Sequence, residues 1–231
     1  FTPQLDVKYA FNGRGITRQQ IYAFGITAVG VAPSNNNVFG GQMAAFEVHG
    51  VNPMKMLIRE KVGMKASVTE AVKEAYGSRN LAPMTKMGIF AMLKEKLAAA
   101  KDYHPEEEKV ERDEKLAALK QVVDKQMPLF VSCNTPTEIR SELRTVADYD
   151  LDRVFCGGFG VDGSLRELAE KRCGLIVANP ANGFNKYTRN TDYAGIAQLA
   201  KQGATVAFSA ADNGYGGRED LLWSALEMQK A

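Results

Sequence analysis

The sequence contains few of the residues that most often bind metals or act as nucleophiles. It has two histidines, His49 and His104, and neither has a partner at HxH, HxxxH or HExxH spacing. A zinc or binuclear hydrolase site usually needs three or more His and carboxylate ligands, so these histidines cannot easily assemble one. The three cysteines, Cys133, Cys156 and Cys173, are widely spaced and form no CxxC pair. This argues against a disulfide framework and indicates a reducing compartment, so we expect a cytoplasmic protein.

A strong excess of one charge and long apolar runs are also missing. The net charge is +2 with 24% charged residues, so bulk charge indicates no nucleic-acid or membrane-surface partner. No apolar run approaches the roughly 18 residues of a membrane-spanning helix, and no charged-then-apolar signal segment opens the chain. Because the sequence begins with Phe1 rather than Met, we expect a fragment of a longer protein.

A regular alternation of strands and helices occupies the second half of the chain. Short apolar runs alternate with stretches of helical period. Four such β-α units in a row predict a parallel sheet with right-handed crossovers, either a (β/α) barrel or a doubly wound sheet. The predicted strands are 128–134, 153–158, 175–180 and 205–210, and the predicted helices are 135–149, 164–172, 194–203 and 219–231.

Helix boundaries support this reading. Thr135 can cap one helix, Ser164 with Glu167 forms a capping-box pattern at the next, and Gly203 suits a helix end. In the first half the signals are weaker, and the stretch 53–67 is ambiguous between helix and strand. There we predict strands at 26–33 and 43–50, a helix at 85–103, and a second helix that starts near Pro105 with glutamates in its first turn.

The carboxyl ends of the predicted strands are where an α/β protein places its chemistry. The strand PLFVSCN (128–134) ends in Ser132, Cys133 and Asn134, but the sequence has no GxSxG motif and no histidine positioned as a base. Asp212 and Asn213 lie just past the last strand, either as a catalytic site or as a helix-capping loop.

A glycine-rich loop follows the strand at 153–158. Gly158–Gly163 matches GxGxxG between a strand and a helix, the context of a dinucleotide fingerprint. The next strand ends in Asn179-Pro180, without the acidic residue that would hold a ribose hydroxyl. Nucleotide binding therefore stands beside the simpler interpretation of a glycine-rich turn at a strand end.

Several stretches match, in order, the patterns of a known family. FGITAVGVAPSNNNVFGGQMAAF (24–46) is similar to aGvTtv.vaPg..n.iGGq, and YGSRNLAPMTKMGIFAMLKEKLAAAKDY (76–103) to tRmg.aallReal..A..Y. PLFVSCNTPTEI (128–139) is similar to Pv.vHahra.di, and residues 203–231 to a final G..vafgsD segment. These patterns resemble the imidazolonepropionase-like members of the amidohydrolase superfamily. The resemblance implies a TIM-like barrel that hydrolyses C–N bonds with water activated by zinc or iron.

The sequence departs from this family at its metal ligands. The HxH motif of the first strand has no counterpart. Ser132 or Asn134 stands where the family has a ligand histidine, and Gly157 or Gly158 stands where it has a second. Asp212 lies one residue beyond the position of the family's catalytic aspartate. Because metal-activated water depends on such ligands, the departures predict a chain without metal.

We therefore expect residues 1–231 to form a single partial amidohydrolase-like barrel domain that lacks the first strand and the small flanking β-domain. The chain would be inactive alone, would hold no metal, and would bind a small molecule or support a homologous catalytic subunit or a missing N-terminal part. The alternatives are an active C–N hydrolase with ligands such as His49, Glu70 and Asp212, and nucleotide binding through Gly158–Gly163. The predicted site has Asp212 as catalytic residue and Ser132, Asn134, Gly157, Gly158, Asn179 and Asn213 at its mouth.

Overall fold

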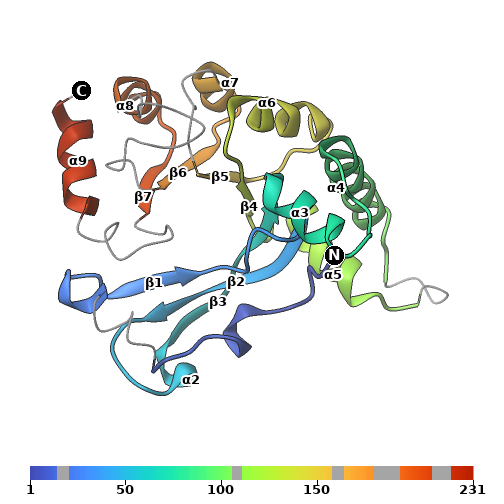
Figure 1. The fold of residues 1–231 in the computed structure, drawn as a ribbon, viewed down its shortest axis with the longest axis horizontal. Helices are drawn as coiled ribbons and strands as arrows, with labels where there is room; N and C mark the ends of the chain where they lie inside the picture. The colour runs from blue at the N-terminus through green and yellow to red at the C-terminus, as the bar shows by residue number, and fades with distance from the viewer. Residues whose placement is uncertain (15–20, 106–110, 158–163, 179–192, 210–219, 231) are drawn as a thin grey trace. The chain divides into compact units, whose positions relative to one another are not determined.

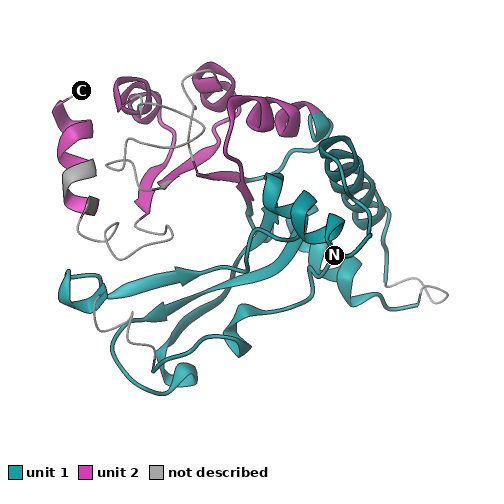
Figure 2. Ribbon diagram, viewed as in Figure 1, with its two compact units in different colours: residues 1–130, 145–152 teal, residues 131–144, 153–231 magenta. Residues whose placement is uncertain are grey.

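The computed structural model describes the chain in two compact units (Figures 1 and 2). Unit 1 comprises residues 1–130 and 145–152, and unit 2 comprises residues 131–144 and 153–231. The described residues are 1–14, 21–105, 111–157, 164–178, 193–209 and 220–230. None of the helices among them is both long enough and apolar enough to cross a membrane.

Unit 1 combines an antiparallel sheet with helices. Strand β1 pairs with β2, and β2 pairs with β3, both antiparallel, with Phe39 opposite Ala66 and Phe46 opposite Leu57 in the second pair. The strand predicted at 26–33 is confirmed, the strand predicted at 43–50 exists but runs from Phe39 to Glu47, and the ambiguous stretch 53–67 is a short helix followed by a strand of 11 residues. The elements are η1 (Val7–Tyr9), β1 (Ala28–Val31), β2 (Phe39–Glu47), α2 (Pro53–Met56), β3 (Leu57–Ser67), α3 (Glu70–Gly77), α4 (Lys86–Lys101) and α5 (Glu114–Val123).

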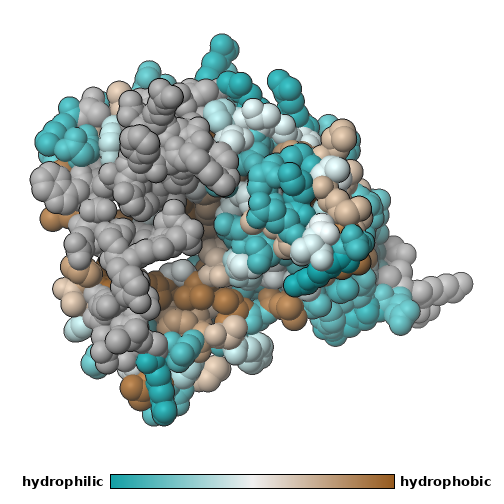
Figure 3. Space-filling view, in the orientation of Figure 1, coloured by the Kyte–Doolittle hydropathy of each residue, from teal (hydrophilic) through white to brown (hydrophobic). Residues whose placement is uncertain are grey.

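The N-terminal segment covers part of β2. The amide of Gln42 donates to the Leu5 carbonyl oxygen at 2.7 Å, and the ring of Phe11 stacks on that of Phe46 at 4.0 Å. Gly41 has φ +138°, and a Cβ atom there would lie 2.6 Å from the Leu5 oxygen, so only glycine allows this close approach. β1 is only half covered, and Figure 3 shows hydrophobic surface over it.

The helices of unit 1 follow the apolar period of the sequence. α4 buries Ile89, Leu93 and Leu97 along one stripe and packs against α5, as predicted for 85–103. The second predicted helix is confirmed as α5, which begins at Glu114, whereas its predicted first turn, with Glu106, Glu107 and Glu108, lies outside the described residues. Asp113 is its N-cap, and the carboxylate accepts from two backbone amides of the first turn.

Unit 2 has the predicted β-α alternation. β5, β6 and β7 pair in parallel, and their order follows the chain without the reversal that marks a doubly wound sheet. This order agrees with part of a (β/α) barrel. The strand β4 (Leu129–Ser132) begins in unit 1 and ends in unit 2. The other elements are α6 (Pro136–Thr145), β5 (Arg153–Gly157), α7 (Leu165–Glu170), β6 (Gly174–Ala178), α8 (Tyr193–Lys201), β7 (Val206–Ser209) and α9 (Asp220–Lys230).

One of the helix boundaries predicted in unit 2, at Gly203, is confirmed, and another, at Ser164, is wrong. The expected terminator Gly203 has φ +92°, and its amide donates to the Ala200 carbonyl after α8. The capping box predicted at Ser164 is wrong, because its side chain makes no capping hydrogen bond and its backbone is not extended, with ψ 10°. The buried Ser164 Oγ has no hydrogen-bond partner among the described residues.

Candidate functional site

The carboxyl end of β4 presents buried polar residues in unit 2. Ser132 and Cys133 are 5% and 1% exposed, and Asn134 is half-buried. The amide of Cys133 donates to the Cys156 carbonyl oxygen at 2.9 Å, which joins the end of β4 to β5. The Cys133 thiol donates to the Val131 carbonyl at 3.5 Å. The thiol is thus turned back into its own strand, which does not suit a nucleophile that must meet a substrate.

A capping box holds the turn that follows β4. Glu138 Oε2 accepts from the amides of Asn134 and Thr135, at 2.6 and 3.2 Å. In return the Glu138 amide donates to Thr135 Oγ1 at 3.2 Å. The backbone of Asn134 is therefore fixed to the first turn of α6, and its amide side chain projects from a defined position.

Gly157, the last residue of β5, has no room for a side chain. Its φ is +119°, and a Cβ atom built there would lie 2.2 Å from the Cys133 carbonyl oxygen. The same atom would be 3.7 Å from Asn134 Oδ1, so the Asn134 amide lies beside this glycine. Any larger residue at position 157, including a metal-binding histidine, would require β4 or β5 to move.

The structure therefore brings together Ser132, Asn134 and Gly157 at the ends of β4 and β5. The other predicted site residues, with the glycine-rich loop, lie outside the described residues, so their predicted roles stay predictions. These residues are Gly158, Asn179, Asp212 and Asn213, with Gly158–Gly163 for the loop.

His49 and Glu70, proposed above as ligands of one metal, lie at opposite ends of the sheet of unit 1. His49 is exposed, follows β2 beyond Phe46, and its ring lies 5.9 Å from that of Tyr22. Glu70 follows β3 at the other end. At roughly 3.3 Å per strand residue, the ends of β3 are on the order of 30 Å apart, so this pair cannot share a metal.

Glu70 is instead engaged by lysines. Its carboxylate lies 2.6 Å from Lys73 Nζ and 3.5 Å from Lys86 Nζ. The hydrogen bond from Lys73, supported by the charge of Lys86, lowers the pKa of Glu70. No group of three or more His, Cys, Asp or Glu side chains within the described ranges could hold a metal ion.

The carboxyl end of β3 carries buried polar residues that sequence reasoning missed. Lys65, Ser67 and Thr69 are 7%, 0% and 1% exposed, and Ser67 Oγ lies 3.0 Å from Thr69 Oγ1. Buried lysine is rare in proteins, which makes Lys65 a functional candidate. The sequence of this strand is ambiguous because Arg59, Glu60, Lys61 and Lys65 interrupt its apolar residues, unlike the continuous apolar run of PLFVSCN.

Comparison with known proteins supports the fold. No protein-family model matches the chain, and no curated protein sequence matches it. A solved crystal structure of an amidohydrolase from Thermotoga maritima MSB8 is similar over 99% of this chain, with a TM-score of 0.86 and 22% identity. The chain spans 62% of the length of that protein. Over that length the chain has the α/β fold of an amidohydrolase, as expected from its sequence, whereas the imidazolonepropionase-like subgroup stays a prediction.

Proposed function

We propose that this chain is a degenerate relative of imidazolonepropionase-like hydrolases of non-peptide C–N bonds, without a catalytic metal at the ends of β4 and β5. In this proposal it binds a small molecule there or supports a homologous catalytic chain. The observation that carries the proposal is the closed space at Gly157, where a Cβ atom would lie 2.2 Å from the Cys133 carbonyl oxygen.

The chemistry of these strand ends supports the same conclusion. The resemblance implies imidazole ligands at the ends of two neighbouring strands, holding zinc or iron. Here β4 offers a hydroxyl and an amide, from Ser132 and Asn134, and β5 ends in a glycine that offers no side-chain ligand. A bound metal is what lowers the pKa of water to about 7 in such enzymes. Loss even of residues that only orient the ligands costs about 10–100-fold in affinity or activity.

The same residues suit hydrogen bonding to a small molecule. The Asn134 amide supplies both a donor and an acceptor, and its backbone is held in place by Glu138. A binding group is most useful when its position is set before the ligand arrives. In this proposal the ends of β4 and β5 therefore bind a small molecule without offering imidazole ligands to a metal.

The experiment is a metal measurement on the purified, full-length protein. After incubation with zinc or iron(II) and desalting, we expect far less than one metal ion per chain by mass spectrometry, and no rise in melting temperature with added metal. The amidohydrolase from Thermotoga maritima, treated in parallel, is the comparison protein. A stoichiometric, tightly held metal in this chain, with hydrolysis of a C–N substrate that a chelator abolishes, would overturn the proposal.

A further inference from the structure

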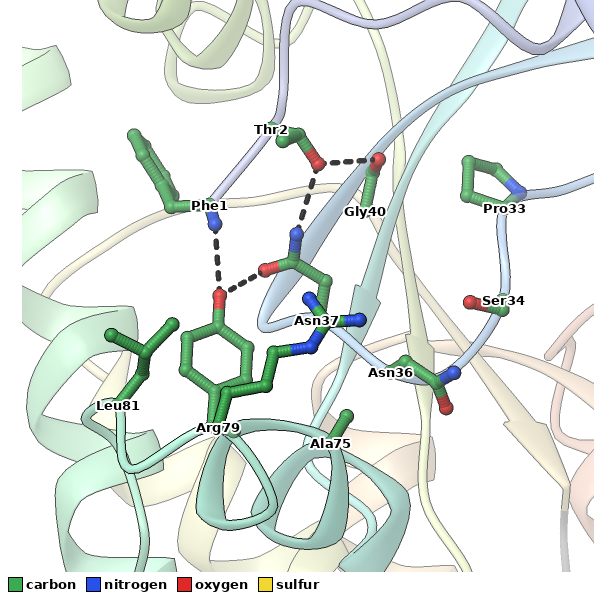
Figure 4. Close-up of a pocket in the computed structure, with 11 residues that line it drawn as sticks. Phe1, Thr2, Pro33, Ser34, Asn36, Asn37, Gly40, Ala75, Arg79 and Leu81 are labelled. Atoms are coloured by element: carbon green, nitrogen blue, oxygen red, sulfur yellow. Dashed lines mark hydrogen bonds between the residues drawn. The ribbon is translucent and has the colours of Figure 1, made fainter.

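A polar cavity of about 430 Å³ lies within unit 1, apart from the strand ends discussed above (Figure 4). Its walls come from the first residues of the chain, from the loop between β1 and β2, and from the end of α3 with the turn that follows. Its volume falls within the range of about 300–1,000 Å³ that is usual for small-molecule sites. The size therefore permits a small organic ligand rather than a few water molecules alone.

A continuous chain of hydrogen bonds builds one wall of this cavity. The nitrogen of Phe1 donates to Tyr76 Oη at 2.8 Å, and the Tyr76 hydroxyl donates to Asn37 Oδ1 at 2.6 Å. Asn37 Nδ2 donates to Thr2 Oγ1 at 2.9 Å, and the Thr2 hydroxyl donates to the Gly40 carbonyl at 3.0 Å. Because Oδ1 accepts and Nδ2 donates in this network, the orientation of the Asn37 amide is set before any ligand binds.

The end of α3 places a cation at the same cavity. Asn80 adopts φ +53°, and the amides of Asn80 and Leu81 donate to the carbonyls of Gly77 and Tyr76, both at 3.0 Å. This turn stops the helix and leaves Arg79 and Leu81 on the cavity wall. Figure 4 shows the Arg79 side chain reaching toward Asn37.

The cavity is electrostatically suited to an anion. Arg79 has the only charged side chain among the described residues that line it, and no Asp or Glu is among them. Burial raises the pKa of Tyr76, and the positive charge of Arg79 acts in the opposite direction. The positive charge of Arg79 therefore acts on the hydrogen-bonded wall that contains Tyr76.

We propose that this cavity binds a small organic carboxylate. The guanidinium of Arg79 can hold both carboxylate oxygens, a geometry that a lysine could not provide. Apolar atoms of Pro33, Ala75 and Leu81 complete the lining and suit the hydrocarbon part of such a ligand. Inorganic phosphate fits less well, because it has no hydrocarbon part to cover these apolar atoms and would have a single guanidinium for its charge. The proposal uses no residue of β4 or β5 and does not depend on the function proposed for them.

The test is calorimetric titration of the full-length protein with benzoate and hexanoate. Benzamide serves as the uncharged analogue, and inorganic phosphate as the anion without an apolar part. We expect saturable binding of at least one of the carboxylates and at least tenfold weaker binding of benzamide and phosphate. Arg79→Gln should weaken carboxylate binding about tenfold or more, because a charged hydrogen-bond partner is lost. Arg59→Gln is the matched control, since Arg59 is exposed in unit 1 and does not line the cavity.

A second variant tests the preformed wall. Tyr76→Phe removes the hydroxyl that orients Asn37, and we expect it to weaken carboxylate binding while the melting temperature stays close to that of the parent protein. The proposal is overturned if neither carboxylate binds, if benzamide binds as tightly as benzoate, or if Arg79→Gln and Arg59→Gln have equal effects. None of these outcomes bears on the metal measurement, so the two proposals fail independently.

Discussion

Glu142 and Arg153 form an ion pair in the interior of unit 2. Arg153 Nη1 lies 3.2 Å from Glu142 Oε2, and the Glu142 side chain is fully buried. In the part of the chain that the structure describes, Glu142 Oε1 and Arg153 Nε have no hydrogen-bond partner. Burial raises the pKa of Glu142 to about 7, although the charge of Arg153 opposes the shift. Arg153 begins β5, at the strand end opposite Gly157, so this pair belongs to the folding of unit 2 rather than to the candidate site.

The raised pKa of Glu142 predicts how the free energy of unfolding depends on pH. The folded chain binds this proton more tightly than the unfolded chain. The protonated Glu142 therefore makes its full contribution to the free energy of unfolding below about pH 4.5, and this contribution is lost as the pH rises to about 7. At 1.36 kcal/mol per pKa unit, the loss is at most about 3 kcal/mol. Urea unfolding of the parent and Glu142→Gln proteins at pH 5 and pH 7 measures it.

The difference between the parent and Glu142→Gln in how the free energy of unfolding changes with pH separates the effect of Glu142 from that of other titrating groups. We expect the parent to lose more stability than Glu142→Gln between these pH values. Glu170→Gln, in the exposed pair with Arg166, is the control and should follow the parent. Equal pH dependence in the parent and Glu142→Gln would contradict the prediction.

Removal of only one member of the buried pair should be costly. Arg153→Met leaves the Glu142 carboxylate buried without its partner, and we expect a loss of about 3–5 kcal/mol at pH 7 by urea unfolding. The double variant with Glu142→Leu removes both polar groups and should recover most of that loss. If the double variant is less stable than Arg153→Met, the pair contributes in a way that the contact geometry does not explain.

The closed space at Gly157 predicts a large effect for a single methyl group. Gly157→Ala combines a positive φ with overlap of the Cys133 carbonyl oxygen, and we expect it to cost about 2–5 kcal/mol. Gly203→Ala is the matched control, because Gly203 also has a positive φ but no neighbouring atom within 4 Å of its Cβ position. It should cost only about 1–2 kcal/mol. Equal losses in the two variants would show that the backbone at Gly157 moves easily.

Two of the helix starts in unit 2, at Thr135 and Ser164, predict opposite results for the loss of a hydroxyl. Thr135→Ala removes a capping acceptor and should cost about 1 kcal/mol. Ser164→Ala removes a buried hydroxyl that caps nothing, and we expect a neutral or slightly stabilising effect. Thermal unfolding of both variants compares them directly. A larger loss for Ser164→Ala than for Thr135→Ala would mean that Ser164 has a role the geometry does not show.

Most of the fold follows from periodicity along the chain. The apolar stripe of α4 and the β-α alternation from β4 to α9 are local patterns, since each element carries its own spacing of apolar residues. Helix ends were less predictable, because a capping side chain succeeds only when the backbone presents its amides. Thr135 meets that condition and Ser164 does not, although both have a glutamate three residues later.

Part of the candidate site could likewise be predicted from the sequence, whereas another part depends on the tertiary structure. From the sequence it was clear that β4 ends in Ser132, Cys133 and Asn134, and the family resemblance predicted a glycine at the position of a ligand histidine. That Gly157 excludes any side chain depends on its distance from Cys133, which is more than 20 residues away along the chain and beside it in the sheet. Likewise, only the pairing of β2 with β3 separates His49 from Glu70. Sequence spacing carries information about one strand or helix at a time, whereas strand pairing decides which distant residues meet.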